Sequence, residues 1–176
     1  GMGKNIVVGV SGGIAAYKAC DVVSKLKKQG FEIDVIMTKN AQEFVSPLTF
    51  QTLSNQKVVT DLFETSSDWN VEHIELAKKA DVFVIVPATA NIIGKIANGI
   101  ADDMLTTTIM ATEAKKVIVP AMNTKMYHNL IVQENILKLK RHGYYFIELV
   151  SGLLACGDTG KGKMEDSTVI VEELCL

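Results

Sequence analysis

The chain of 176 residues is 48% hydrophobic and carries a net charge of −2, so it can bury the core of a single domain spanning residues 1–176. The weak negative charge and the scattered basic residues argue against a nucleic-acid partner. Three cysteines are too few for a disulfide framework or a zinc site, so we expect no metal and a reducing, cytoplasmic setting. No apolar run approaches the roughly 18 residues of a membrane span, and we expect no membrane partner.

Short β-branched runs alternate with amphipathic stretches along the chain. In chain order, the patterns predict strand 4–10, helix 15–29, strand 31–38, a short helix from Pro47 with Ser46 as its cap, a polar connection 64–70, helix 74–79, strand 81–87, helices 91–98 and 102–112, strand 115–120, helix 130–142, strand 144–149 and helix 167–174. Strands that are apolar on both faces and alternate with helices indicate a parallel sheet covered on two sides. We therefore predict an α/β fold with a Rossmann-like, doubly wound, mostly parallel sheet in three αβα layers.

The carboxyl ends of the predicted strands are where an open parallel sheet binds its ligand. Four such ends carry the sequences SGGIA, TKNAQEF, PATANIIGK and PAMNTKM. They are rich in small residues, hydroxyls and amides, and so provide backbone donors and neutral polar groups rather than a row of charges. A phosphorylated planar cofactor suits such an edge.

The paired glycines Gly12 and Gly13 fall where the first strand passes into a helix. The free N–H groups of such a turn, at the positive end of the helix dipole, can bind a phosphate. An isolated Gly-Gly pair can equally serve only to permit a tight turn. A nicotinamide dinucleotide is disfavoured, because the GxGxxG pattern is absent and the second strand ends in Thr38 and Lys39 rather than in an acidic residue.

A second glycine-rich stretch lies near the end of the chain. Residues 157–163 match the GxxxxGK frame of a nucleoside-triphosphate loop, but Met164 stands where the magnesium-binding Ser or Thr is needed and no helix pattern follows. We predict instead a mobile flap over about residues 151–166, which carries Cys156 and Lys161 over a site.

Three stretches of the sequence, in this order, resemble the flavin-containing cysteine decarboxylase family, and within it the phosphopantothenoylcysteine decarboxylases. They are the run from VEHI to DDMLTT at 71–107, PAMNTKMYHN at 120–129 and LLACGDTGKGKM at 153–164. The resemblance runs from Ile6 to Met164. It implies a Rossmann-like flavoprotein that binds FMN and assembles as a homotrimer or dodecamer with active sites between subunits. It also implies decarboxylation of 4′-phosphopantothenoylcysteine to 4′-phosphopantetheine in coenzyme A biosynthesis.

The resemblance also assigns roles to individual residues. His73 matches the family's active-site base, Asn123 the residue that holds the substrate's carboxylate and amide, and Cys156 the flap cysteine that completes the reaction. Met126 beside Asn123, and Lys161 in the flap, are the further candidates for binding the substrate. The residues that match the family's cofactor site, or are expected beside it, are Ser11, Gly12, Gly13, Ile14, Thr38, Phe44, Thr89, Ala90, Asn91, Thr106, Thr107 and Ala121.

In the mechanism that the resemblance implies, FMN takes two electrons from the thiol-bearing carbon and leaves a thioaldehyde, which accepts the electrons released as carbon dioxide departs. Hydride from the reduced flavin and a proton from Cys156 then convert the ene-thiolate to the product thiol, with no net redox change. Whether His73 takes the thiol proton or orients the carboxylate is left open. Tyr127 stands where many members have Trp, and Thr89 where Ser is more usual.

Alternative interpretations exist for each feature. A histidine near a helix start is often a cap or surface residue, and an asparagine after Pro-Ala can be a simple turn residue. For the whole chain, an FMN-binding regulatory protein and a peptide-cysteine decarboxylase are the alternatives. The presence of His73, Asn123 and Cys156 together favours an enzyme. Because the chain ends soon after Met164, we expect a monofunctional decarboxylase that depends on a separate synthetase.

Overall fold

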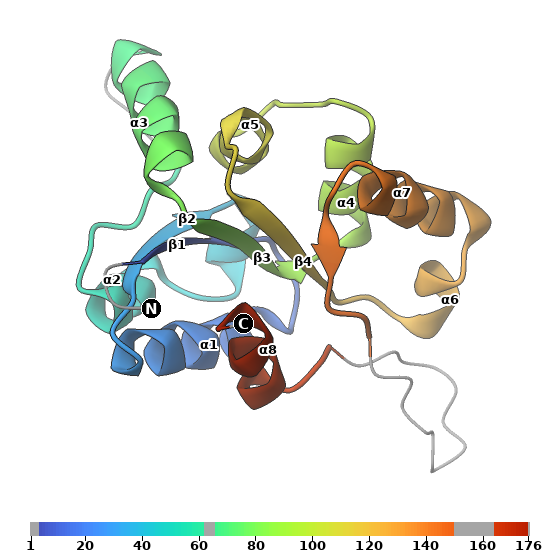
Figure 1. Ribbon diagram of the computed structural model, residues 1–176, viewed down its shortest axis with the longest axis horizontal. Helices are drawn as coiled ribbons and strands as arrows, with labels where there is room; N and C mark the ends of the chain where they lie inside the picture. Colours follow the sequence, from blue (N-terminus) through green and yellow to red (C-terminus); the bar gives the residue numbers. More distant parts are fainter. Residues whose placement is uncertain (1–3, 62–65, 150–163, 176) are drawn as a thin grey trace.

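The computed structural model describes residues 4–61, 66–149 and 164–175 (Figure 1). In these ranges, five strands form one parallel sheet in the order β2-β1-β3-β4-β5. The strands are β1 Asn5–Val10, β2 Glu32–Met37, β3 Val82–Ala88, β4 Lys115–Pro120 and β5 Tyr145–Phe146. Because the order runs outward in both directions from the β1/β3 pair, the sheet is doubly wound, and the predicted Rossmann-like fold is confirmed.

Helices cover both faces of the sheet (Figure 1). They are α1 Ala16–Lys28, η1 Asn40–Glu43, α2 Pro47–Ser54, α3 Ser66–Lys79, α4 Ala90–Ala97, α5 Met104–Ala111, α6 Thr124–Tyr127, α7 Leu130–Arg141 and α8 Ser167–Leu174. One apolar layer joins the sheet to α1, α2 and α8, and the other joins it to α3, α4, α5 and α7. This is the three-layer αβα arrangement that the alternation of strands and helices predicts.

Alternation of side chains along β1 explains why its sequence is continuously apolar. Ile6, Val8 and Val10 belong to the layer under α1, whereas Val7 belongs to the layer under α5, and all four are fully buried. A strand buried on both faces has no position where a polar side chain could reach water. The apolar run NIVVGV is therefore the signature of a central strand in a covered parallel sheet.

Local signals at helix starts are confirmed where a side chain caps the helix. Ser46 accepts a hydrogen bond from the amide of Leu48, and Pro47 is the first residue of α2.

The predicted polar connection 64–70 is wrong over most of its length, because α3 begins at Ser66. This helix is held by tertiary contacts: it packs on α5, and the Thr112 hydroxyl donates to the carbonyl of Ala77 at 2.7 Å.

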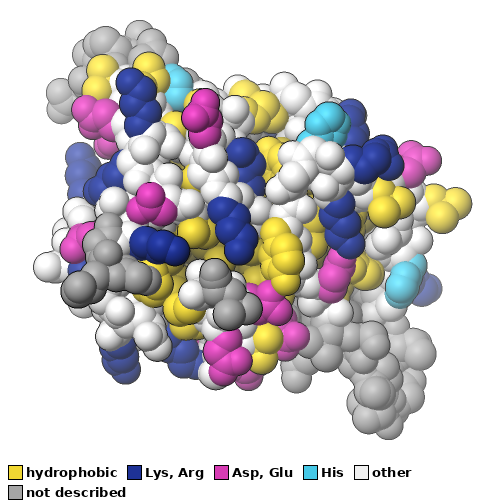
Figure 2. All heavy atoms as spheres, in the orientation of Figure 1, with side chains coloured by type: hydrophobic (Ala, Val, Ile, Leu, Met, Phe, Trp, Pro, Cys, Tyr) yellow, Lys and Arg dark blue, Asp and Glu magenta, His cyan; other side chains and the backbone are white. Residues whose placement is uncertain are grey.

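The molecular surface is mixed in charge. Figure 2 shows lysine and arginine side chains interspersed with aspartate and glutamate over the visible face. None of the helices in the described parts of the chain combines the length and apolar character needed to cross a membrane.

Candidate active site

The strand order predicts a ligand-binding crevice at the carboxyl ends of β1 and β3. The chain leaves β1 for α1 on one face of the sheet and leaves β3 for α4 on the other. Where neighbouring strands connect to opposite faces, their following loops separate and leave room for a ligand. In the order 2-1-3-4-5 this reversal falls between the first and third strands. The glycine turn after β1 and Thr89 after β3 lie beside each other, since a Cβ at Gly13 would be 4.0 Å from the Thr89 Cγ2.

Ser11 ties the two strand ends together. Its hydroxyl donates to the carbonyl of Pro87 at 2.6 Å and accepts from the amide of Thr89 at 3.2 Å. The residue is only 3% exposed. The donor and one of the two acceptor lone pairs of this hydroxyl are thus used within the protein, and these bonds fix the spacing of the two loops.

Gly12 lies against Asn40 of η1, with no space for a side chain. A Cβ atom at position 12 would lie 2.3 Å from the Asn40 Nδ2 and 3.0 Å from its backbone carbonyl carbon. Within the described residues, the amides of Gly12 and Gly13 donate to no protein acceptor. Unpaired amides where a strand turns into a helix form a cradle for an anion. The turn therefore fits a phosphate group, as the sequence predicts.

The end of β2 forms the neighbouring part of the crevice. The amide of Thr38 donates to the carbonyl of Val10 at 3.1 Å, and its hydroxyl accepts from the amide of Ala41 at 3.1 Å. Two predicted cofactor residues expose apolar side chains: Ile14, after the glycine turn, is 82% exposed, and Phe44, after η1, is 47% exposed. Apolar side chains so exposed beside a polar turn suit contact with a planar ring.

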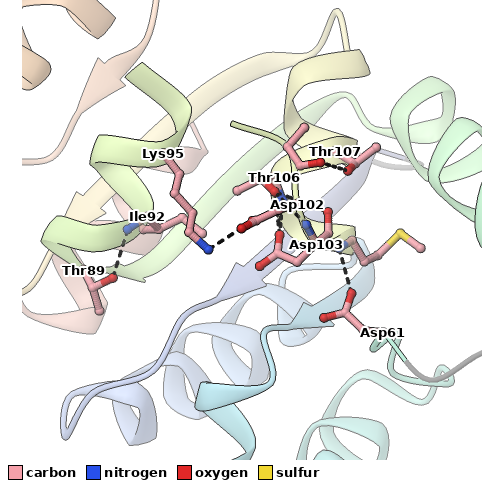
Figure 3. A network of polar contacts seen from close by, with 10 residues as sticks. Asp61, Thr89, Ile92, Lys95, Asp102, Asp103, Thr106 and Thr107 are labelled. Atoms are coloured by element: carbon pink, nitrogen blue, oxygen red, sulfur yellow. Dashed lines mark hydrogen bonds and ion pairs between the residues drawn. The ribbon is translucent and has the colours of Figure 1, made fainter. Parts of the chain in front are cut away.

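The loop after β3 presents the start of α4 to the same opening. The Thr89 hydroxyl caps this helix by accepting from the amide of Ile92 at 3.2 Å (Figure 3). Ala90 is half-buried and Asn91 is exposed. Their amides belong to the first turn of α4, where backbone donors have no partner within a helix. At the other end of the helix, Lys95 pairs with Asp102 at 3.0 Å.

The start of α5 differs from the starts of α1 and α4, because two carboxylates already accept hydrogen bonds from its first amides (Figure 3). Asp103 accepts from the amide of Thr106 at 2.8 Å in a capping box, and Asp61 accepts from the amide of Met104 at 2.8 Å. The hydroxyl of the fully buried Thr106 is held by Asp103, whereas Thr107 is half-buried. These carboxylates offset the positive end of the helix, so the starts of α1 and α4 are better placed to bind a phosphate.

Asn123 lies in the loop that follows β4. The loop begins beside β3, where the amide of Ala121 donates to the carbonyl of Ala88 at 3.0 Å. Asn123 caps α6, since its Oδ1 accepts from the amide of Met126 at 2.9 Å. The cap uses the side-chain oxygen and leaves the two Nδ2 donors for a ligand. Asn123 is exposed and Met126 is 46% exposed, as substrate-binding residues must be before the substrate arrives.

His73 lies on α3, half-buried. It is one turn before Leu76 and Ala77, and residues three and four apart share a helix face. Because Leu76 is buried in the layer that includes α5, and the carbonyl of the buried Ala77 accepts from Thr112 at the end of α5, His73 points to the same side of the helix. Its neighbour Glu72 has a pKa raised by burial and, to a lesser extent, by the charge of Glu75.

One chain alone does not bring all the predicted catalytic residues together. Figure 1 places α3, which carries His73, and α6, which Asn123 caps, on opposite sides of the molecule. Cys156 and Lys161 lie outside the described residues, as does most of the predicted flap. Their roles stay predictions.

Comparison with known proteins decides the family. A family model described as Flavoprotein matches residues 2–175. The chain belongs to the Flavoprotein family. It is 43% identical over 175 residues to a protein of Streptococcus mutans described as a probable phosphopantothenoylcysteine decarboxylase, and the match covers 98% of both chains. This flavoprotein chain is also similar in structure to the FMN-dependent cysteine decarboxylase SpaF, with a TM-score of 0.79 and 32% identity over 96% of each chain.

The flavoprotein chain also matches part of a longer protein. It is 52% identical over 169 residues to the coenzyme A biosynthesis bifunctional protein CoaBC of Bacillus subtilis. That match covers 96% of the chain but 42% of the relative, so the chain spans less than half the length of the bifunctional protein.

Proposed function

We propose that this flavoprotein is an FMN-dependent decarboxylase that converts 4′-phosphopantothenoylcysteine to 4′-phosphopantetheine in coenzyme A biosynthesis. The observation that carries the proposal is the 43% identity to the Streptococcus mutans relative along 98% of both chains. The single FMN-binding domain of residues 1–176 and a cytoplasmic location belong to the same proposal, since the Bacillus subtilis relative is named as a coenzyme A biosynthesis protein.

The residues around the β1/β3 crevice fit FMN. The unpaired amides of Gly12 and Gly13 suit its phosphate, and Ile14 and Phe44 offer apolar surface to a planar ring. When bound, FMN supplies a reversible two-electron acceptor, which the loss of carbon dioxide from an unactivated cysteine requires. Ser11 keeps the two loops of the crevice at a fixed spacing through its bonds to both strand ends.

The protein's own side chains then bind the substrate and move its protons. The Nδ2 donors of Asn123 suit the substrate carboxylate, while the cap at Oδ1 keeps the side chain in one orientation. The imidazole of His73 either accepts the thiol proton or orients the substrate carboxylate. Cys156 would return a proton to the product, in a segment that lies outside the described residues.

Assembly completes this site. Because α3 and α6 lie on opposite sides of one chain (Figure 1), His73 of one subunit can meet Asn123 only across an interface. A homotrimer or a dodecamer with active sites between subunits supplies such an interface. Exposed apolar side chains on α3, Val71 at 54% and Ile74 at 45%, fit a helix that is covered by a second copy.

A comparison of the reaction rates of two substrates tests the proposal. The purified protein with FMN should release carbon dioxide from 4′-phosphopantothenoylcysteine and much more slowly from a peptide that ends in cysteine. Carbon dioxide and the thiol product are measured together, so that oxidation without decarboxylation is recognised. Faster reaction of the peptide would identify a peptide-cysteine decarboxylase, and no reaction of either substrate would favour a regulatory FMN-binding protein.

A further inference from the structure

The loop that carries Asn123 is anchored through Tyr127, the last residue of α6. The Tyr127 hydroxyl donates to Oε2 of Glu148, just after β5. Its backbone carbonyl accepts from the Gln133 Nε2 on α7 at 2.5 Å. Tyr127 is therefore held at its side chain by a residue that follows β5 and at its main chain by a residue on α7.

Tyr127 is joined directly to Asn123. The amide of Tyr127 donates to the carbonyl of Asn123 at 3.0 Å, and the amide of Met126 donates to the Asn123 Oδ1 at 2.9 Å. α6 is a single turn of four residues, and an isolated turn of helix is not stable by itself. Its conformation, and with it the direction of the Asn123 side chain, depends on the contacts at Tyr127.

Glu148 is suited to hold the anchor. Its other oxygen lies 2.5 Å from the Lys140 Nζ, so the carboxylate is oriented by a cation from α7 while it accepts from the phenol. Burial raises the pKa of Glu148. Lys140 also lies over the ring of Phe146, at 5.7 Å from the ring centre. Among the described residues, a phenol from α6 and an ammonium from α7 bind the Glu148 carboxylate.

We propose that Tyr127, through its hydrogen bond to Glu148, is a positioning residue that directs the Asn123 amide toward the substrate carboxylate. This inference rests on the proposed function for the identity of the substrate. Loss of the hydroxyl leaves the ring of Tyr127 in its apolar contacts and its carbonyl bonded to Gln133, but removes one of the two hydrogen bonds that anchor the turn. The substrate then binds to a population in which Asn123 is correctly oriented only part of the time.

Two matched variants separate this role from a general effect of removing a phenol. Tyr127→Phe should raise the KM for 4′-phosphopantothenoylcysteine roughly tenfold, as expected for weakening one hydrogen bond to a charged group, with kcat much less affected and FMN content unchanged. Tyr145→Phe is the control, because its hydroxyl also donates to a carboxylate, Glu173, at 2.5 Å, but on the exposed side of β5. That variant should keep the wild-type KM.

A double-mutant cycle tests whether the effect passes through Asn123. In the Asn123→Ala background, Tyr127→Phe should change the KM little further, because effects that act through one group are not additive. Glu148→Gln, which keeps an acceptor for the phenol, should fall between wild type and Tyr127→Phe. An unchanged KM in Tyr127→Phe, or an equal effect in both backgrounds, overturns the proposal.

Hydrogen exchange provides a measurement that does not need turnover. The amide of Met126, which donates to Asn123, should exchange roughly tenfold faster in Tyr127→Phe than in the wild type, and at the wild-type rate in Tyr145→Phe. Equal exchange in all three proteins would overturn the positioning role. If the three proteins show the expected exchange rates but the wild type does not convert 4′-phosphopantothenoylcysteine, the result counts against the proposed function alone.

Discussion

Replacing His73 with asparagine should leave a yellow, FMN-bound protein that has lost turnover. His73 lies on α3 and is not part of the glycine turn after β1 that suits the cofactor phosphate, so we expect FMN to stay bound when only this side chain is changed. Asparagine keeps a polar side chain of similar reach but cannot accept and release a proton. General acid–base groups contribute about 10²- to 10⁴-fold to rates, and we expect kcat to fall within that range.

The control for this variant is His142→Asn. His142 is exposed, follows the last residue of α7 and has no predicted role at the site, so its replacement should leave kcat unchanged. The two variants are compared by steady-state release of carbon dioxide and by the flavin absorbance of the purified proteins. Normal decarboxylation by His73→Asn would remove His73 from the mechanism.

Replacing Asn123 with aspartate should abolish productive binding of the substrate. The new carboxylate can still accept from the amide of Met126 and cap α6, so the turn is preserved. In place of two donors, however, the substrate carboxylate meets a negative charge. Loss of a hydrogen bond to a charged group, together with repulsion between like charges, should lower kcat/KM at least about 100-fold.

Asn129→Asp is the matched control, because it makes the same change at a second helix cap six residues further along. The Asn129 Oδ1 accepts from the amides of Ile131 and Val132, and an aspartate can do the same. This variant should bind and convert the substrate as the wild type does. An unchanged KM in Asn123→Asp would show that Asn123 does not contact the carboxylate.

The fold could be predicted where side-chain periodicity reports burial directly. The strand at 115–120 and the helix at 167–174 have the predicted bounds. The strand is marked by a continuous apolar run that is buried on both faces, and the helix by buried residues three and four positions apart. The start of α3 could not be found in this way. Residues 66–70 are polar, and the helix is stabilised by its packing on α5 rather than by a local pattern.

At the site, too, features set by neighbouring residues could be predicted from the sequence, whereas contacts between residues far apart in the chain could not. The glycine turn was visible in the sequence because Gly12 follows an apolar strand directly. The Asp61 contact with the amide of Met104 and the Tyr127 contact with Glu148 join residues 43 and 21 positions apart. No spacing rule links such pairs, since they meet only after the sheet has brought their elements together. Sequence spacing also gave no sign that the Ser11 hydroxyl is used inside the protein.

The binding of FMN by the purified protein tests the central claim most directly. After incubation with FMN and removal of free flavin, the wild type should keep the cofactor at one per chain, and Gly94→Ala, whose new Cβ would meet only the Asn135 Nδ2 at 3.6 Å, should do the same. Gly12→Ala should lose the cofactor, because its Cβ would collide with Asn40 at 2.3 Å. A wild-type protein that remains colourless, or a Gly12→Ala variant that binds FMN as well as the wild type does, would contradict the account.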